Sequence, residues 1–228
     1  MSTGESRGPR ANVKTLSDVT PERVQWLWPG WLPIGKLVIL DGDPSVGKST
    51  LTASGYFCAA PVLTAAWAAR VSTGTPWPDG SECLAGDVLL LSAEDGLGDT
   101  IRPRLDAAGG NAERIHALES VTYVAEDGTT RARAFNLSDV AALERTVSEH
   151  RPRLVLIDVL MAYMPGKVDS HKDQDVRTVL GELARIADRY GCCIVALRHM
   201  NKSAGTRALY RGAGSIGIVG AARVGMLA

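Results

Sequence analysis

The sequence predicts an α/β protein with a mainly parallel β-sheet and helices on both faces of that sheet. Short apolar runs at residues 36–41, 87–92, 153–158 and 193–197 have the length of buried strands. Segments with helical spacing lie between these runs, and a glycine-rich turn follows the first of them. Because strands that alternate with helices form parallel sheets, these observations together indicate a sheet with helices on both sides.

The first part of the chain is predicted to form strand, loop and helix. The strand at residues 36–41 ends at a glycine turn, and the segment after Lys48 is rich in Ala and Leu. A mostly apolar run at residues 56–69 contains Pro61 and is too short to span a bilayer. We therefore expect a buried helix with a kink at the proline.

The middle of the chain follows the same alternation. After the strand at residues 87–92, a helix is predicted at residues 99–108, and Gly109 and Gly110 end it. A weaker strand is predicted at residues 116–123, and a turn at residues 126–130.

Two amphipathic helices and a last strand are predicted in the second half. Ser138 is the expected N-cap of a helix that reaches about His150. The apolar positions of the two helices are Val140, Leu143 and Val147 in the first, and Val176, Val179, Leu180, Leu183, Ile186 and Ala187 in the second. A final strand is expected at residues 221–227.

Composition limits the size and the partners of the protein. The 228 residues, 45% of them hydrophobic, suit one domain over residues 16–228, preceded by a disordered leader over residues 1–15. Lys plus Arg and Asp plus Glu are each 25, so no overall field draws the protein onto DNA or a membrane. The segment after Asp188 is nevertheless basic, because it holds no acidic residue but contains Arg189, Arg198, Lys202, Arg207, Arg211 and Arg223.

Cysteine and tryptophan usage adds two expectations. The four cysteines have neither a zinc spacing nor a disulfide pattern, the first twenty residues lack an apolar signal, and we expect a cytoplasmic protein. Trp26, Trp28 and Trp31 suit either base stacking or packing of the entry segment against the core, and packing is the interpretation we favour.

The motif G-x-x-x-x-G-K-[ST] begins at Gly42 and lies between a predicted strand and a predicted helix, as a phosphate-binding P-loop requires. Its backbone N–H groups would surround the phosphates of ATP, Lys48 would bridge the β- and γ-phosphates, and Ser49 would hold Mg²⁺. The predicted nucleotide-binding residues are Gly42, Asp43, Pro44, Ser45, Val46, Gly47, Lys48, Ser49 and Thr50.

Two further strands end in acidic residues. Asp158 ends the strand at residues 153–158 and would point toward the metal held by Ser49, although such an aspartate can also cap the next helix. Glu94 follows the strand at residues 87–92 and could place water against the γ-phosphate, or could simply lead a solvated loop. This strand intervenes in the sequence between the P-loop and Asp158, which favours a RecA-like ATPase over a nucleoside-monophosphate kinase.

Several segments resemble the RepA-type AAA-family ATPases, relatives of a plasmid hexameric replicative helicase and, more distantly, of DnaB and RecA. The resemblance covers residues 15–228 and rests on these segments: residues 23–30, 32–37, 72–80, 92–95, 198–202 and 211–215, with the P-loop. It implies a RecA-like ATPase core, a homo-oligomer in the form of a hexameric ring, and single-stranded DNA as a partner.

The resemblance also implies roles for individual residues. Glu94 would activate water, Asp158 would hold the metal, His199 would sense the γ-phosphate, and Arg104 would approach the phosphates. Arg223 or Arg211 would reach the ATP of a neighbouring subunit. Lys202 and Arg207 lie in a loop that either binds single-stranded DNA or is a solvated basic loop.

The chain departs from its relatives in three places. The segment between Thr50 and Arg70 is longer, Arg198-His199 stands where relatives often have two histidines, and the relatives continue with further strands beyond residue 228. The sequence therefore predicts a Mg²⁺-dependent ATPase, with three functions left open: the motor of a plasmid- or phage-type replication helicase, a regulatory ATP switch, or a truncated nucleotide-binding remnant.

Overall fold

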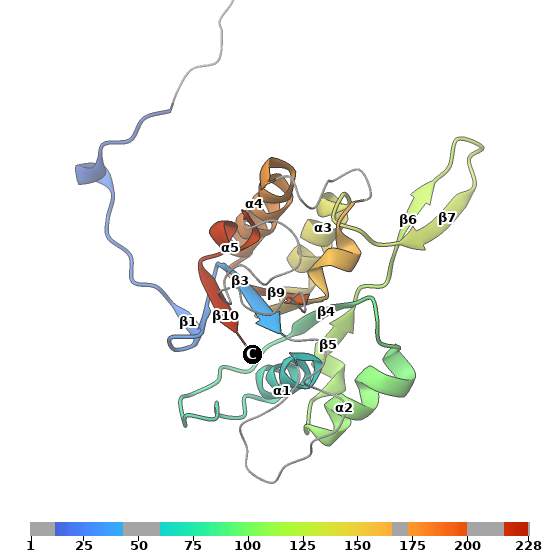
Figure 1. Ribbon diagram of the computed structural model, residues 1–228, viewed down its shortest axis with the longest axis horizontal. Coiled ribbons are helices and arrows are strands. Elements are labelled where there is room, and N and C mark those ends of the chain that lie inside the picture. Colours follow the sequence, from blue (N-terminus) through green and yellow to red (C-terminus); the bar gives the residue numbers. More distant parts are fainter. Residues whose placement is uncertain (1–11, 43–59, 166–172, 200–216, 228) are drawn as a thin grey trace, which may run out of the picture.

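The computed structural model describes residues 12–42, 60–165, 173–199 and 217–227. Its centre is a six-stranded sheet in the order β10-β3-β9-β8-β4-β5, in which every neighbouring pair is parallel (Figure 1). The strands are β3 (Leu37–Gly42), β4 (Val88–Ser92), β5 (Ile115–Ala117), β8 (Leu154–Asp158), β9 (Cys193–His199) and β10 (Val224–Leu227). The predicted fold class is confirmed.

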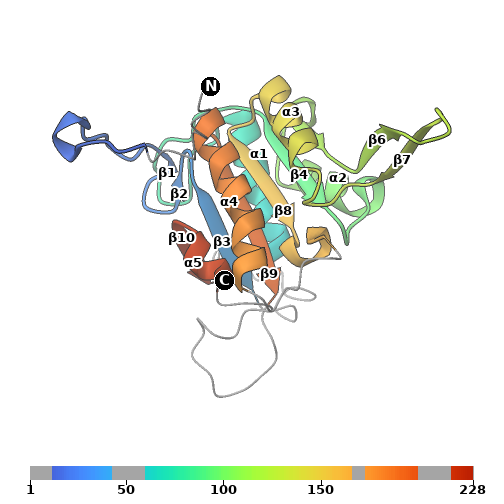
Figure 2. The same cartoon turned by 90° about the horizontal axis from the view of Figure 1, so that it is seen from above.

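Helices cover both faces of this sheet. One face carries α3 (Val140–His150), α4 (Asp173–Tyr190) and α5 (Gly217–Ala221), and the other carries α1 (Ala60–Thr73) and α2 (Arg102–Ala107). Figure 2 shows α4 and α1 on opposite sides of the strands. The alternation of side chains along each strand produces the two layers. In β3, for example, Leu37 and Ile39 face α4, whereas Val38 and Leu40 face α1.

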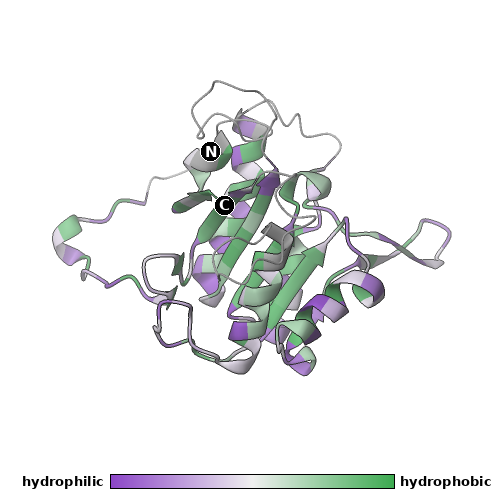
Figure 3. Ribbon diagram, turned by 60° about the horizontal axis from the view of Figure 1, so that its bottom comes forward, coloured by the Kyte–Doolittle hydropathy of each residue, from purple (hydrophilic) through white to green (hydrophobic). Residues whose placement is uncertain are grey.

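The strands are apolar along most of their length because both of their faces are covered (Figure 3). The predicted helical stripes are confirmed, since five of the six apolar positions of α4 are 0% exposed and Val179 is partly buried. In α3, Leu143 and Val147 are fully buried.

The single strand predicted at residues 116–123 is wrong. β5 pairs with β4 for only three residues, and the chain then leaves the sheet to form a separate antiparallel hairpin of β6 (Ser120–Val124) and β7 (Thr130–Ala134). Most of the hairpin is exposed, so burial gave no signal for β7. The predicted turn at residues 126–130 is confirmed, with Gly128 at φ +77° and a hydrogen bond from the Thr129 N–H to Asp127.

Two helix starts also differ from the prediction. Asp139, not Ser138, is the N-cap residue of α3. The Asp139 carboxylate accepts hydrogen bonds from Arg133 at 2.5 and 2.7 Å. The Ser138 hydroxyl donates instead to Asn136. The helix predicted at residues 99–108 begins as a π-helical turn, η2 (Leu97–Ile101), before α2.

The entry segment packs through Trp28. Residues 12–25 are exposed and include a short turn, η1 (Leu16–Asp18), before the two-stranded pair of β1 (Trp26–Trp28) and β2 (Leu32–Pro33). Trp28 stacks on Trp77 with ring centroids 4.6 Å apart, and Trp77 donates to the Leu27 carbonyl at 2.8 Å. The packing interpretation is confirmed for Trp28, whereas Trp26 and Trp31 are 37% and 49% exposed.

The remaining elements complete the chain. Two short turns, η3 (Ala112–Arg114) and η4 (Leu160–Tyr163), follow α2 and β8. Pro61 is the second residue of the described part of α1. The strand predicted at residues 221–227 is shorter, because Ala221 ends α5. The helices within the described ranges are all too short or too polar to cross a membrane.

Candidate active site

The carboxyl ends of four neighbouring strands lie side by side at one edge of the sheet. Gly42 at the end of β3 is aligned with His199 at the end of β9, and Asp158 at the end of β8 is aligned with Ser92 at the end of β4. The Asp158 carbonyl also accepts a hydrogen bond from the Ala93 N–H at 3.0 Å. Ligands of open parallel sheets bind at this edge. The fold therefore brings the P-loop entry and the acidic strand ends together.

The order of the strands determines which strand ends are neighbours at this edge. β9 lies between β3 and β8, and β4 lies on the far side of β8. The strand that separates the P-loop strand from Asp158 in space is therefore β9, which comes later in the chain than either. The strand at residues 87–92, which intervenes in the sequence, does not intervene in the sheet.

Asp158 has the most strongly shifted pKa of the described residues at this edge. Burial and the nearby carboxylates of Asp95 and Glu94 raise its pKa to about 6, although His199 and Arg104 oppose the rise. Among the described residues, no side chain donates a hydrogen bond to this carboxylate or lies within ion-pair distance of it. At neutral pH the edge thus holds a partly buried negative charge that the described residues compensate only partly.

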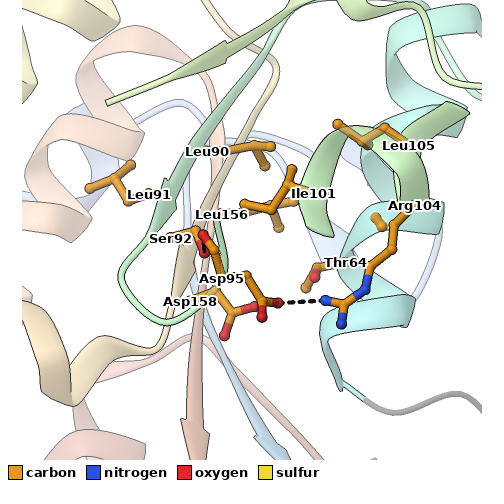
Figure 4. Close-up of a pocket in the computed structure, with 11 residues that line it drawn as sticks. Thr64, Leu90, Leu91, Ser92, Asp95, Ile101, Arg104, Leu105, Leu156 and Asp158 are labelled. Atoms are coloured by element: carbon orange, nitrogen blue, oxygen red, sulfur yellow. Dashed lines mark hydrogen bonds and ion pairs between the residues drawn. The ribbon is translucent and has the colours of Figure 1, made fainter. Parts of the chain in front are cut away.

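Asp95 and Arg104 form an ion pair beside Asp158 (Figure 4). Both side chains are partly buried and line a small cavity of about 30 Å³ that Thr64 and Asp158 also line. A cavity of this size can hold one water molecule, and its polar groups could bind it. The resemblance singled out Arg104 but did not assign it a partner. In the sequence, the adjacent acids Glu94 and Asp95 were what could have indicated that partner.

Glu94 and His199 come from strands that do not neighbour each other, yet their side chains meet. The Nε2 atom of His199 lies 3.5 Å from a carboxylate oxygen of Glu94, and both side chains are accessible to solvent. At this distance the contact is long for a hydrogen bond. A ligand phosphate placed at this edge could therefore compete for the imidazole.

Most of the predicted P-loop lies outside the described residues. This applies to Asp43, Pro44, Ser45, Val46, Gly47, Lys48, Ser49 and Thr50, and also to Lys202, Arg207 and Arg211. Gly42 is the one P-loop residue within the described ranges, and it is buried at the end of β3.

Arg223 lies at the other end of the sheet. Its backbone N–H donates to the carbonyl of Leu37, the first residue of β3, at 2.9 Å, and its side chain is exposed. The strand from Leu37 to Gly42 spans roughly 17 Å at the usual rise per residue. Arg223 therefore cannot reach the candidate site of its own chain, and any role at a nucleotide would require a second copy.

A buried ion pair lies directly behind the strand ends and was not anticipated from the sequence. The Nε and Nη2 atoms of Arg198 on β9 donate to the two carboxylate oxygens of Asp41 on β3, at 2.6 and 2.7 Å. The two residues are 2% and 7% exposed. The available signal was a single charged residue near the end of each of two otherwise apolar strands.

The described residues fit one type of metal site. They contain no cluster of three or more His, Cys, Asp or Glu side chains able to enclose a metal ion. Mg²⁺ does not need such a cluster, because it usually binds one or two carboxylates together with phosphate oxygens and water. The Asp158 carboxylate, with its raised pKa and its acidic neighbours, suits a divalent cation at this position.

The fold and the position of Gly42 define a P-loop NTPase with a RecA-like core. A family model described as an AAA domain, AAA_25, matches residues 6–205, which is most of the chain. The chain therefore belongs to this family of AAA-type P-loop ATPases, in agreement with the resemblance inferred from the sequence.

Proposed function

We propose that this protein is a Mg²⁺-dependent ATPase that hydrolyses ATP at the carboxyl edge of β3, β9, β8 and β4. The observation that carries the proposal is the strand order, because it aligns Gly42 with His199 and Asp158 with Ser92 at a single edge. Family membership supports nucleotide binding, and the partly buried charge of Asp158 supports a cation.

Binding would depend on three side chains. Lys48 would contact the β- and γ-phosphates, while Ser49 and Asp158 would hold Mg²⁺. The metal would neutralise charge on the phosphate oxygens as the bond to the γ-phosphate breaks. Since Asp158 ends a strand that is buried up to this residue, the sheet sets the position from which its carboxylate would reach the metal.

Hydrolysis would depend on Glu94 and His199. Glu94 follows the end of β4 and is exposed, so that its carboxylate can accept a proton from an attacking water. His199 would donate a hydrogen bond to a γ-phosphate oxygen from the end of β9. Because the two side chains meet at this edge, a γ-phosphate bound between them would separate them. Arg104 would turn from Asp95 toward the phosphates.

The finer proposal is a DNA motor, and it rests on the resemblance to replication helicases of plasmid and phage type. A hexameric ring would place Arg223 or Arg211 of one subunit at the ATP of the next. This agrees with the distance of Arg223 from the site of its own chain. Lys202 and Arg207 would contact the phosphates of single-stranded DNA.

The test is the rate of ATP hydrolysis with and without single-stranded DNA, at several salt concentrations, beside sizing of the protein with a non-hydrolysable ATP analogue and Mg²⁺. Lys48→Ala is the control for the P-loop and should abolish turnover. Unchanged turnover in that variant would refute the site.

Two other results bear on the alternatives, the first on the DNA motor alone and the second on the ATPase itself. Hydrolysis that ignores DNA, in a protein that remains a monomer with ATP and Mg²⁺, would favour an ATP switch over a motor. Nucleotide binding without turnover would favour a remnant.

A further inference from the structure

The ion pair of Asp41 and Arg198 occupies an unusual place in the sheet. The two residues face each other on the neighbouring strands β3 and β9, one position before Gly42 and His199. Their side chains are joined by two hydrogen bonds of 2.6 and 2.7 Å, in the fork geometry that arginine forms with a carboxylate. The pair therefore joins the last residues of the strand that leads to the P-loop and of the strand that carries His199.

Stability alone does not account for these charges. Transferring two ions from water to a protein interior is costly, and apolar residues of similar volume commonly give equal or greater stability. The residues just before the pair on both strands are buried apolar side chains, since Leu40 and Leu197 are 2% and 1% exposed. What a fork-shaped ion pair adds is a fixed orientation and register of its two partners.

The positions next to the pair are those for which orientation matters most. Gly42 begins the P-loop motif, and the His199 imidazole lies 3.5 Å from Glu94 across the edge of the sheet. A displacement of about 1 Å at a reacting centre can lower a rate by roughly a hundredfold. A slip of β9 against β3 would move His199 relative to both Gly42 and Glu94.

We propose that Asp41 and Arg198 are positioning residues for ATP hydrolysis, because their buried ion pair holds His199 and the P-loop entry in the register that the reaction requires. The pair does not touch the nucleotide and acts through its two chain neighbours. This role rests on the proposed ATPase function and adds to it the residues that align the site.

The test replaces the pair by an apolar pair, Asp41→Val with Arg198→Met, and measures melting temperature, affinity for a Mg²⁺-bound non-hydrolysable ATP analogue, and kcat. The melting temperature should stay within a few degrees of wild type. The affinity should change by less than about threefold. A loss of register should lower kcat by at least about tenfold.

A second variant keeps the charges and changes only the geometry. Asp41→Glu with Arg198→Lys retains an ion pair but loses the planar fork, and it should lower kcat at a melting temperature near that of wild type. This variant decides the question if the apolar pair does not fold. The matched control removes the exposed ion pair at the other end of β3, through Lys36→Met with Asp188→Asn, and should leave kcat unchanged.

The outcomes separate the two proposals. A wild-type protein that hydrolyses ATP, together with paired variants of equal kcat, would refute the positioning role and leave the ATPase intact. A wild-type protein without turnover would refute the ATPase and the positioning role with it.

Discussion

Asp158→Asn should make the nucleotide-free protein more stable while it weakens Mg²⁺-dependent nucleotide binding. The carboxylate at the end of β8 is partly buried beside Asp95 and Glu94, and its pKa is raised to about 6. Asparagine has nearly the same shape but no charge. The substitution therefore removes an unfavourable, partly buried charge from the free protein, together with a ligand that the bound metal would use.

The size of the effect follows from the pKa. A rise from 3.8 to about 6 is about two pKa units, and at 1.36 kcal/mol per unit the ionised carboxylate costs the folded state up to about 3 kcal/mol at pH 7. The folded pKa lies above the unfolded one, so the contribution of this group to stability is fully present below pH 3.8. That contribution is lost as the pH rises through 6, and the cost at pH 7 is this loss. At about 2–4 °C per kcal/mol for a chain of this size, we expect a rise in melting temperature of up to about 6–12 °C at pH 7.5 and a much smaller one near pH 4.

The assay is thermal unfolding of both proteins from pH 4 to pH 8 in EDTA, repeated with Mg²⁺ and a non-hydrolysable ATP analogue. Asp41→Asn is the matched control near the end of β3, which β9 separates from β8. It leaves the Arg198 charge buried without its carboxylate partner and should lower stability by about 3–5 kcal/mol. A melting temperature of Asp158→Asn below that of wild type, or an increase that does not depend on pH, would show that the charge of Asp158 is already compensated.

Three further predictions concern catalysis, assembly and the core. Glu94→Gln should lower kcat strongly at near wild-type ATP affinity, and normal turnover would show that Glu94 is a solvated loop residue without a role in hydrolysis. Arg223→Ala should cut turnover and spare binding; mixing it with Glu94→Gln subunits should restore some activity, and no recovery would argue against a shared site. Leu180→Ala, at a position that is 0% exposed, should lower the unfolding free energy in urea by about 2–5 kcal/mol, whereas the exposed Thr178→Ala should change it by less than about 0.5 kcal/mol. Equal losses in the last two variants would contradict the assigned burial.

Buried elements could be predicted from the sequence because burial leaves a pattern in residue types. The stripe of α4 and the runs of β3, β4, β8 and β9 were all recognisable, since both faces of these strands are covered. The exposed hairpin of β6 and β7 has no such pattern, and the prediction merged β5 with β6 and missed β7.

Helix starts were less predictable, because a residue of a capping type does not always make the capping hydrogen bond. Ser138 and Asp139 are both good capping types. In the structure the Asp139 carboxylate binds Arg133 at the end of β7 and accepts no hydrogen bond from the first turn of α3. The partner of Asp95 was likewise not evident from the sequence, since it is Arg104 of the next helix.

By itself, the sequence determined the fold class, the P-loop motif and the acidic residues at the strand ends, because these depend on local residue type and spacing. The tertiary structure decided how the strands are ordered, and with it that β9 separates β3 from β8. That order creates the contact between His199 and Glu94 and the buried pair of Asp41 and Arg198, whose members are 157 positions apart. Asp41 and Arg198 meet because they lie on neighbouring strands, which run about 4.8 Å apart whatever their separation in the chain.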